Sequence, residues 1–124
     1  DLWDEGNINS EGKLKEGKRV GTWIYYWKNG NKGLEKNFKN GELDGLYTMW
    51  YENGRKRIEG SYENGLKHGR SIAWHQNGVK WQQKSYHLGN PVGKWKIWDK
   101  RGTLTSEVSH GEISERNNSL LIND

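Results

Sequence analysis

Glycine recurs with a period of 24 residues through most of this chain, and no other feature constrains the fold as strongly. Three series of glycines share the period: Gly6, Gly30, Gly54, Gly78 and Gly102; Gly17, Gly41, Gly65 and Gly89; and Gly21, Gly45, Gly69 and Gly93. A period of this length is typical of proteins in which one small unit cannot bury its own apolar surface and stacks on its neighbours. The sequence therefore predicts a stacked-repeat architecture.

Each repeat has the pattern of a β-hairpin. In residues 17–40, a run of β-branched and aromatic residues precedes Asn29-Gly30, and a second strand-like run follows it. Asn-Gly favours a type I′ turn, whose two central residues both need positive φ, and it recurs at Asn53-Gly54 and Asn77-Gly78. We expect an all-β fold, an elongated single antiparallel sheet of tandem 24-residue hairpins with about nine strands.

The repeats also predict how the chain is divided. One repeat domain covers residues 1–111, with a partial repeat at 1–16, full repeats at 17–40, 41–64 and 65–88, and a divergent repeat at 89–111. Residues 112–124 leave the pattern and are expected to form a polar C-terminal tail or a cap on the open edge strand. Asp1 falls within a repeat, so we expect the natural N-terminus to be truncated or processed in this chain.

Composition excludes several classes of protein. A hydrophobic share of 31% and a mean hydropathy of -1.18 are too low for an ordinary globular core, yet eight Trp and six Tyr argue against disorder. No apolar run approaches the roughly 20 residues that span a bilayer, so we expect a soluble chain. Cysteine is absent, which excludes disulfides and leaves the compartment undetermined.

A two-residue loop at Asn29-Gly30 sets the register between the strands on either side. This register pairs Tyr25 with Leu34 and Trp23 with Lys36. It also places an aromatic ring opposite a strand glycine in each full repeat, the arrangement called aromatic rescue. These ring and glycine pairs are Phe38 with Gly21, Tyr62 with Gly45, and Tyr86 with Gly69.

Alternation along the strands assigns the side chains to two faces. One face keeps a ring in every repeat, namely Tyr26, Trp50, Trp74 and Trp98, and we expect that row to be the core rather than a stacking platform for bases or sugars. The other face is less apolar in the third repeat, where it carries Ser71, Ala73, His75 and Gln82.

Ring and lysine pairs on the less apolar face are the candidate binding residues. The register places Trp27 beside Lys32, Tyr51 beside Lys56, and His75 beside Lys80. A ring next to an ammonium group at a regular pitch suits an anionic or acidic partner. The alternative is a solvated edge on which lysine stems cover the rings.

No pattern in the sequence indicates catalysis, a metal or a cofactor. Glutamates at one repeat position would lie about 10 Å apart, too far for a pair of catalytic carboxylates, and we expect them to pair with lysines or turn amides. These are Glu11, Glu35, Glu59 and Glu107. The four histidines, His68, His75, His87 and His110, lack metal-ligand spacing.

The repeat resembles the MORN repeat, and in particular its bacterial variant. The variant pattern G-x-W-x-x-[WY]-x-x-N-G, followed by Glu and an aromatic residue, corresponds to residues 21–30 with Glu35 and Phe38. Residues 45–65 follow the pattern as well. The third copy departs at Ser71 and Gln83, and the fourth lacks the Asn. The resemblance covers roughly residues 4–110.

What the resemblance implies is an elongated sheet that acts as a scaffold. Bacterial members are often described as antitoxins of toxin–antitoxin pairs, which implies tight binding to a partner protein. Eukaryotic relatives are associated with membranes, lipid kinases and junctions. We therefore expect a non-enzymatic scaffold for protein–protein interaction, with an antitoxin-like component as the finer expectation; the alternative is binding of an anionic membrane surface, polysaccharide or nucleic acid.

Overall fold

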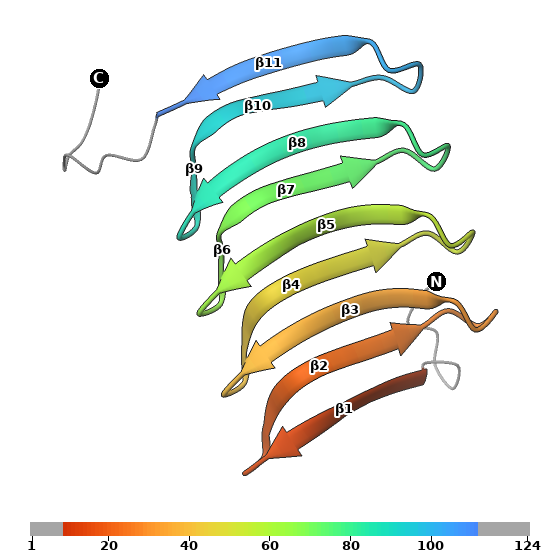
Figure 1. Ribbon diagram of the computed structural model, residues 1–124, viewed down its shortest axis with the longest axis vertical. Helices are drawn as coiled ribbons and strands as arrows, with labels where there is room; N and C mark the ends of the chain where they lie inside the picture. Colours follow the sequence, from red (N-terminus) through yellow and green to blue (C-terminus); the bar gives the residue numbers. More distant parts are fainter. Residues whose placement is uncertain (1–8, 112–124) are drawn as a thin grey trace.

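The computed structural model describes residues 9–111, which form one open antiparallel sheet (Figure 1). Within that range the strands are β1 (Asn9–Lys15), β2 (Lys18–Tyr26), β3 (Lys32–Lys39), β4 (Glu42–Trp50), β5 (Lys56–Glu63), β6 (Leu66–Lys67), β7 (Gly69–Trp74), β8 (Lys80–His87), β9 (Asn90–Pro91), β10 (Gly93–Trp98) and β11 (Leu104–His110). The expected fold class is confirmed.

The strands follow one another across the sheet in chain order. Nine of them form the continuous path β1-β2-β3-β4-β5-β7-β8-β10-β11, while the short strands β6 and β9 pair with β5 and β8. Figure 1 shows all four longer loops on one side of the sheet and the tight turns on the other. The predicted tail at 112–124 lies outside the described residues.

The tight turns are the type I′ turns of this protein. Both central residues have positive φ in each of them, as in Asn40 (52°) and Gly41 (87°). Such a turn matches the right-handed twist of the flanking strands. The four turns are at Glu16-Gly17, Asn40-Gly41, Asn64-Gly65 and Leu88-Gly89.

The prediction of a type I′ turn at Asn29-Gly30 is wrong. The Gly30 N–H donates to the Trp27 carbonyl and the Trp27 N–H donates to the Asn31 carbonyl, so the loop has three residues. Only Gly30 has a positive φ, 92°, whereas Asn29 does not. This geometry is a type I turn followed by a left-handed glycine, and equivalent backbone bonds close the loops that contain Gly54, Gly78 and Gly102.

The longer loop adds a β-bulge to every second strand. Tyr26 pairs with Lys32, Gly33 is the extra residue, and the expected register returns at Tyr25 and Leu34. Bulges at the same place interrupt β4–β5 and β7–β8. The predicted pairs of Trp27 with Lys32, Tyr51 with Lys56, and His75 with Lys80 are therefore wrong, because these lysines lie opposite Tyr26, Trp50 and Trp74.

The pairs of ring and glycine are confirmed, but the reason given for them is not. Phe38 lies opposite Gly21, Tyr62 opposite Gly45, and Tyr86 opposite Gly69. The three glycines have φ of 71°, 106° and 95°, a region that side chains disfavour. A Cβ added to them would meet no ring atom; the only close atoms belong to Asn37 and Ser61. Backbone conformation, not coverage by a ring, therefore requires glycine here.

The sheet has little buried core in the described residues. Only Leu34 (3% exposed) and Ala73 (6%) are buried apolar side chains. Both belong to the face that was expected to be the less apolar one, while the row of Tyr26, Trp50, Trp74 and Trp98 is half-buried. The expectation that this row is the core is wrong in that respect, since a single-layer sheet leaves both faces accessible.

Candidate binding surface

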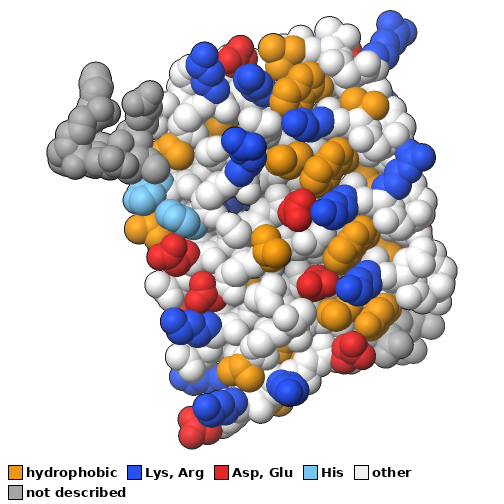
Figure 2. All heavy atoms as spheres, viewed as in Figure 1, with side chains coloured by type: hydrophobic (Ala, Val, Ile, Leu, Met, Phe, Trp, Pro, Cys, Tyr) orange, Lys and Arg blue, Asp and Glu red, His pale blue; other side chains and the backbone are white. Residues whose placement is uncertain are grey.

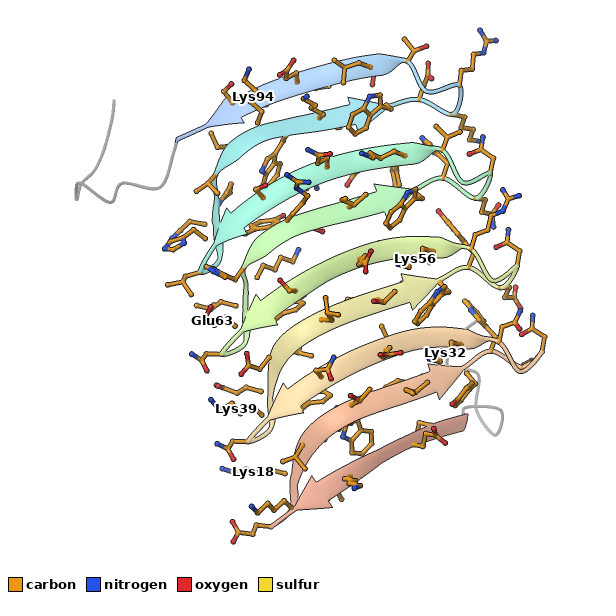
Figure 3. All side chains as sticks on the ribbon, viewed as in Figure 1. Lys18, Lys32, Lys39, Lys56, Glu63 and Lys94 are labelled. Atoms are coloured by element: carbon orange, nitrogen blue, oxygen red, sulfur yellow. The ribbon has the colours of Figure 1, made fainter. Side chains whose placement is uncertain are left out.

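One face, which we call the tryptophan face, carries Tyr26, Trp50, Trp74 and Trp98 with Lys32, Lys56 and Lys80. Figure 2 shows this face, on which hydrophobic side chains alternate with basic ones in a row across the strands. Lys32 and Lys56 lie at the starts of β3 and β5 (Figure 3). The Lys32 ammonium lies 5.8 Å from the Trp50 ring centroid, and that of Lys80 lies 5.4 Å from Trp98. Lys32 and Lys80 therefore each bridge two consecutive rings of the row.

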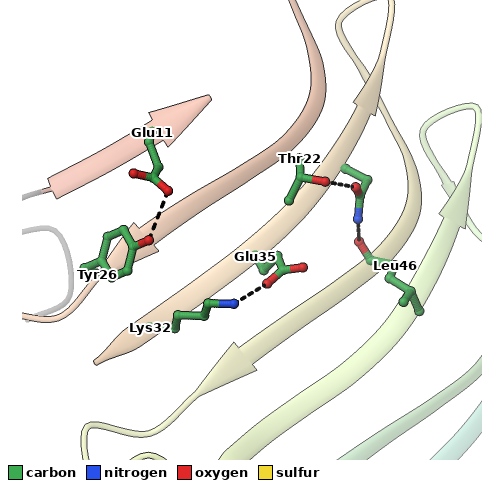
Figure 4. Close-up of polar contacts among 7 residues, drawn as sticks. Glu11, Thr22, Tyr26, Lys32, Glu35 and Leu46 are labelled. Carbon is green, nitrogen blue, oxygen red and sulfur yellow. Dashed lines mark hydrogen bonds and ion pairs between the residues drawn. The ribbon is translucent and has the colours of Figure 1, made fainter. Parts of the chain in front are cut away.

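Glutamates hold Lys32, Lys56 and the tyrosine of this face in place, whereas Lys80 donates to Gln83 Oε1. Lys32 Nζ lies 3.2 Å from Glu35 Oε1, and the Tyr26 hydroxyl donates to Glu11 Oε1 at 3.1 Å (Figure 4). Lys56 and Glu59 form the same ion pair at 3.2 Å, and Lys94 lies 3.8 Å from Glu107. Desolvation, and then the hydrogen bond to the Glu11 carboxylate, raise the pKa of Tyr26. The expected pairing with lysines is found for Glu35, Glu59 and Glu107, whereas Glu11 accepts from a tyrosine hydroxyl instead.

The rings of Trp27, Tyr51 and His75 join each repeat to the next. Trp27 Nε1 donates to the Trp50 carbonyl at 3.2 Å, the Tyr51 hydroxyl donates to the Trp74 carbonyl at 2.7 Å, and His75 Nε2 donates to the Trp98 carbonyl at 2.9 Å. Each ring thus reaches 23 residues along the chain. The rings proposed as binding residues have a structural task, and their polar atoms are occupied.

The opposite face, which we call the tyrosine face, carries rings from every repeat and a different set of cations. Its rings touch in pairs, with centroids 6.3 Å apart for Trp23 and Phe38, 5.5 Å for Tyr47 and Tyr62, and 5.2 Å for Tyr86 and Trp95. Its cations lie 5.0–5.7 Å from ring centroids. They are Arg19, Lys36, Lys67 and Lys84.

The cations of the tyrosine face differ from those of the tryptophan face in their electrostatic environment. No carboxylate among residues 9–111 forms an ion pair with Arg19, Lys36, Lys67 or Lys84. Burial, and then the nearby Arg19 guanidinium, lower the pKa of Lys36. Burial, and then Tyr62, raise the pKa of Tyr47. Within the described residues, the face therefore combines cations that lack a carboxylate partner with the hydroxyl groups of several tyrosines.

A hollow of about 250 Å³ lies on the tyrosine face across β4, β5, β7 and β8. We call it the pit. Its floor contains Gly60, Ser71 and Ala73, and its rim contains Tyr47, Tyr62, Tyr86, Lys67 and Lys84. A Cβ added to Gly60 would lie 3.3 Å from Ser71 Oγ, so the two small residues adjoin.

Sequence reasoning noticed the small residues of the third repeat but did not find the pit. Ser71 occupies the position of Trp23, Tyr47 and Trp95, and Gly60 occupies that of Lys36 and Lys84. The signal was present, because the antiparallel register places Ser71 beside Gly60. The small residues of the third repeat were interpreted only as a sign that this face is the weaker candidate for the core.

The described residues offer no other recognisable chemistry. No group of three or more His, Asp or Glu in that range is placed to hold a metal ion. None of the described elements is a helix with the length and apolarity needed to cross a membrane.

Comparison with protein families gives a match that covers part of the chain. Residues 43–64 match the family model described as MORN repeat variant. The comparison with curated proteins found no match. The MORN repeat is generally a non-enzymatic binding repeat, which agrees with a scaffold of hairpins. Over residues 43–64, which include Gly60 and two tyrosines of the pit, the chain is thus similar to the MORN repeat variant.

Proposed function

We propose that this protein is a non-enzymatic scaffold that binds another protein through the tyrosine face. The observation that supports the proposal is the contrast in charge between the faces. Lys32 and Lys56 have glutamate partners, whereas Lys36 and Lys84 lie over aromatic rings without a carboxylate from the described residues. Such cations suit a partner surface rich in Asp and Glu, because complementary charge favours encounter and register.

Within this proposal, the finer role is that of an antitoxin-like component. The resemblance to the bacterial MORN variant motivates it, and the broad accessible face is suited to binding over a large area of a partner protein. A scaffold of this kind would act by blocking the surface through which its partner is active.

Capture from the source cell tests the scaffold role with matched variants. The double variant Lys36→Gln/Lys84→Gln removes two cations from the tyrosine face, and Lys32→Gln/Lys56→Gln removes two from the tryptophan face. We expect the wild type and the second variant to retain a stoichiometric acidic protein that the first variant loses. Equal recovery of the acidic protein by the two double variants would reject binding through the tyrosine face.

Two further measurements separate the finer role and the alternative function. Expression of the captured protein alone should arrest growth, and co-expression with this chain should restore it; normal growth would reject the antitoxin-like role. The alternative, an anionic membrane surface, polysaccharide or nucleic acid, predicts binding to phosphatidylserine vesicles or oligo(dT) that weakens steeply with salt. Such binding without a captured protein would replace our proposal.

A further inference from the structure

The pit exists because two side chains are missing at the same place on the tyrosine face. At the equivalent place in the first repeat, an added Cβ on Gly12 would overlap the Trp23 ring, so that ring fills the space above the glycine. Above Gly60 the neighbouring residue is Ser71, and the space stays open. The hollow is therefore specific to the junction of the second and third repeats.

The rim of the pit provides donors and positive charge. The hydroxyls of Tyr47, Tyr62 and Tyr86 have no hydrogen-bond partner among the described residues, and neither does the Ser71 hydroxyl on the floor. Lys67 lies 5.1 Å from the Tyr86 ring centroid and Lys84 lies 5.0 Å from that of Trp95. No Asp or Glu from residues 9–111 lines the pit. This combination of O–H donors and ammonium groups favours a carboxylate.

The size of the pit limits what can occupy it. About 250 Å³ is below the roughly 300–1,000 Å³ of sites that enclose a whole drug-sized ligand. The pit therefore suits part of a larger ligand that lies across the face, such as one side chain of a protein segment.

We infer that the pit receives a Glu or Asp side chain from an acidic segment of the partner protein. This inference rests on the proposed function and names the contact at its centre. The carboxylate lies between the lysines of the rim and accepts hydrogen bonds from the tyrosine hydroxyls, while the remainder of the segment crosses the neighbouring rings.

Nuclear magnetic resonance of the full chain with a hexaglutamate peptide tests the inference. At low salt, we expect the largest amide shift changes at Gly60, Ser71, Ala73 and Gln82, with a hexalysine peptide as the negative control. Inorganic phosphate is titrated in parallel. Equal affinity for phosphate and hexaglutamate would overturn the assignment to a protein segment and indicate a small-anion site.

Two variants fill the pit with residues that the chain already carries at equivalent positions. Ser71→Tyr supplies the ring of position 47, and Gly60→Val supplies the side chain of position 108. We expect each to weaken hexaglutamate binding at least about tenfold, while far-UV circular dichroism confirms that the sheet persists. If one variant fails to fold, the other decides. Unchanged affinity in a folded variant would overturn the inference.

A pair of lysines on one strand provides the charge control. Lys84→Gln on the rim should weaken binding by roughly 1.5- to 5-fold, the range for an exposed ion pair, whereas Lys80→Gln on the tryptophan face should leave it unchanged. Equal effects of the two lysine variants on hexaglutamate affinity would contradict the assignment of the pit as the binding site. The pit-filling variants could bind hexaglutamate normally while Lys36→Gln/Lys84→Gln still loses the captured protein. That result would reject the pit as the carboxylate site and leave the proposed scaffold function supported.

Discussion

In the loop at residues 75–79, the Asn77 side chain has two hydrogen bonds. Its Oδ1 accepts from the Val79 N–H at 2.9 Å, and its Nδ2 donates to the Lys100 carbonyl at 3.0 Å. Asn29 has the same two contacts two repeats earlier in the stack. Aspartate could supply only the acceptor, so asparagine is the residue that both closes its own loop and holds the next one.

At residue 64, the same dipeptide has another physical basis. Asn64 has φ of 50°, in the left-handed region that asparagine tolerates, and its turn is type I′. One Asn-Gly pair is therefore selected by side-chain hydrogen bonds and the other by backbone conformation.

A comparison of glycine substitutions separates the two roles. Asn77→Gly should lower the free energy of unfolding by about 1–3 kcal/mol, because two hydrogen bonds worth about 0.5–1.5 kcal/mol each are lost. Asn64→Gly should change it by no more than about 0.5 kcal/mol, since glycine adopts positive φ readily. Urea unfolding measures both. Equal destabilisation would show that the loop contacts do not differ in importance.

The hairpin is the element whose turns explain what the sequence could and could not predict. Strand order and most of the register follow from the spacing of glycines and aromatic residues, and Tyr25 opposite Leu34 was correct. The bulge at Gly33 was not predictable from Asn29-Gly30, because a two-residue and a three-residue loop use the same dipeptide. That one-residue difference moved Lys32, Lys56 and Lys80 to the other face.

The candidate site depended on the same difference. Alternation identified two faces correctly, but it could not show which cations have partners, because Glu35 reaches Lys32 only across the bulge. The pit was missed for another reason. The pit is formed by small residues on two adjacent strands, and it becomes visible only when the residues of the two strands are compared across the sheet rather than along the chain.

One type I′ turn contains an unfavourable residue and provides a test at the scale of the element. Leu88 has φ of 46° and is 41% exposed, whereas asparagine occupies the equivalent positions 40 and 64. Leu88→Asn should raise the free energy of unfolding by about 0.5–1 kcal/mol, since a left-handed conformation costs most side chains roughly 1–2 kcal/mol.

The reciprocal variant is the control. Asn40→Leu should lower the free energy of unfolding by a similar amount, measured by thermal and urea unfolding of both proteins. A stabilising effect of Asn40→Leu would contradict the assignment of the turn.

The whole molecule is held together by contacts between adjacent repeats. Backbone pairing joins neighbouring strands, and the ring bonds of Trp27, Tyr51 and His75 reach only the next repeat. Stability of such a stack is approximately a sum over repeats and their interfaces. Among residues 9–111, no contact closes the sheet on itself, so nothing in that range fixes the number of repeats.

Excision of one period tests this additivity. Deletion of residues 41–64 joins Asn40 to Gly65 and restores an Asn-Gly turn, so we expect a shorter folded sheet. Its free energy of unfolding should fall by about 1–4 kcal/mol, from roughly 0.05–0.15 kcal/mol per residue over 24 residues. Deletion of residues 45–68, which removes the same period at another boundary, should behave alike in circular dichroism and urea unfolding. Loss of the folded sheet in both would contradict additivity.

The alternation of side chains between the tryptophan and tyrosine faces has a consequence for how such a protein can evolve. Even and odd positions of one strand lie on separate faces, so one set can keep the stack aligned while the other forms the surface that we propose binds a partner. Substitutions at alternate positions of a single repeat, such as serine at residue 71, can reshape recognition while the ladder of rings on the reverse side stays intact. A new specificity could thus arise within 24 residues without a new fold.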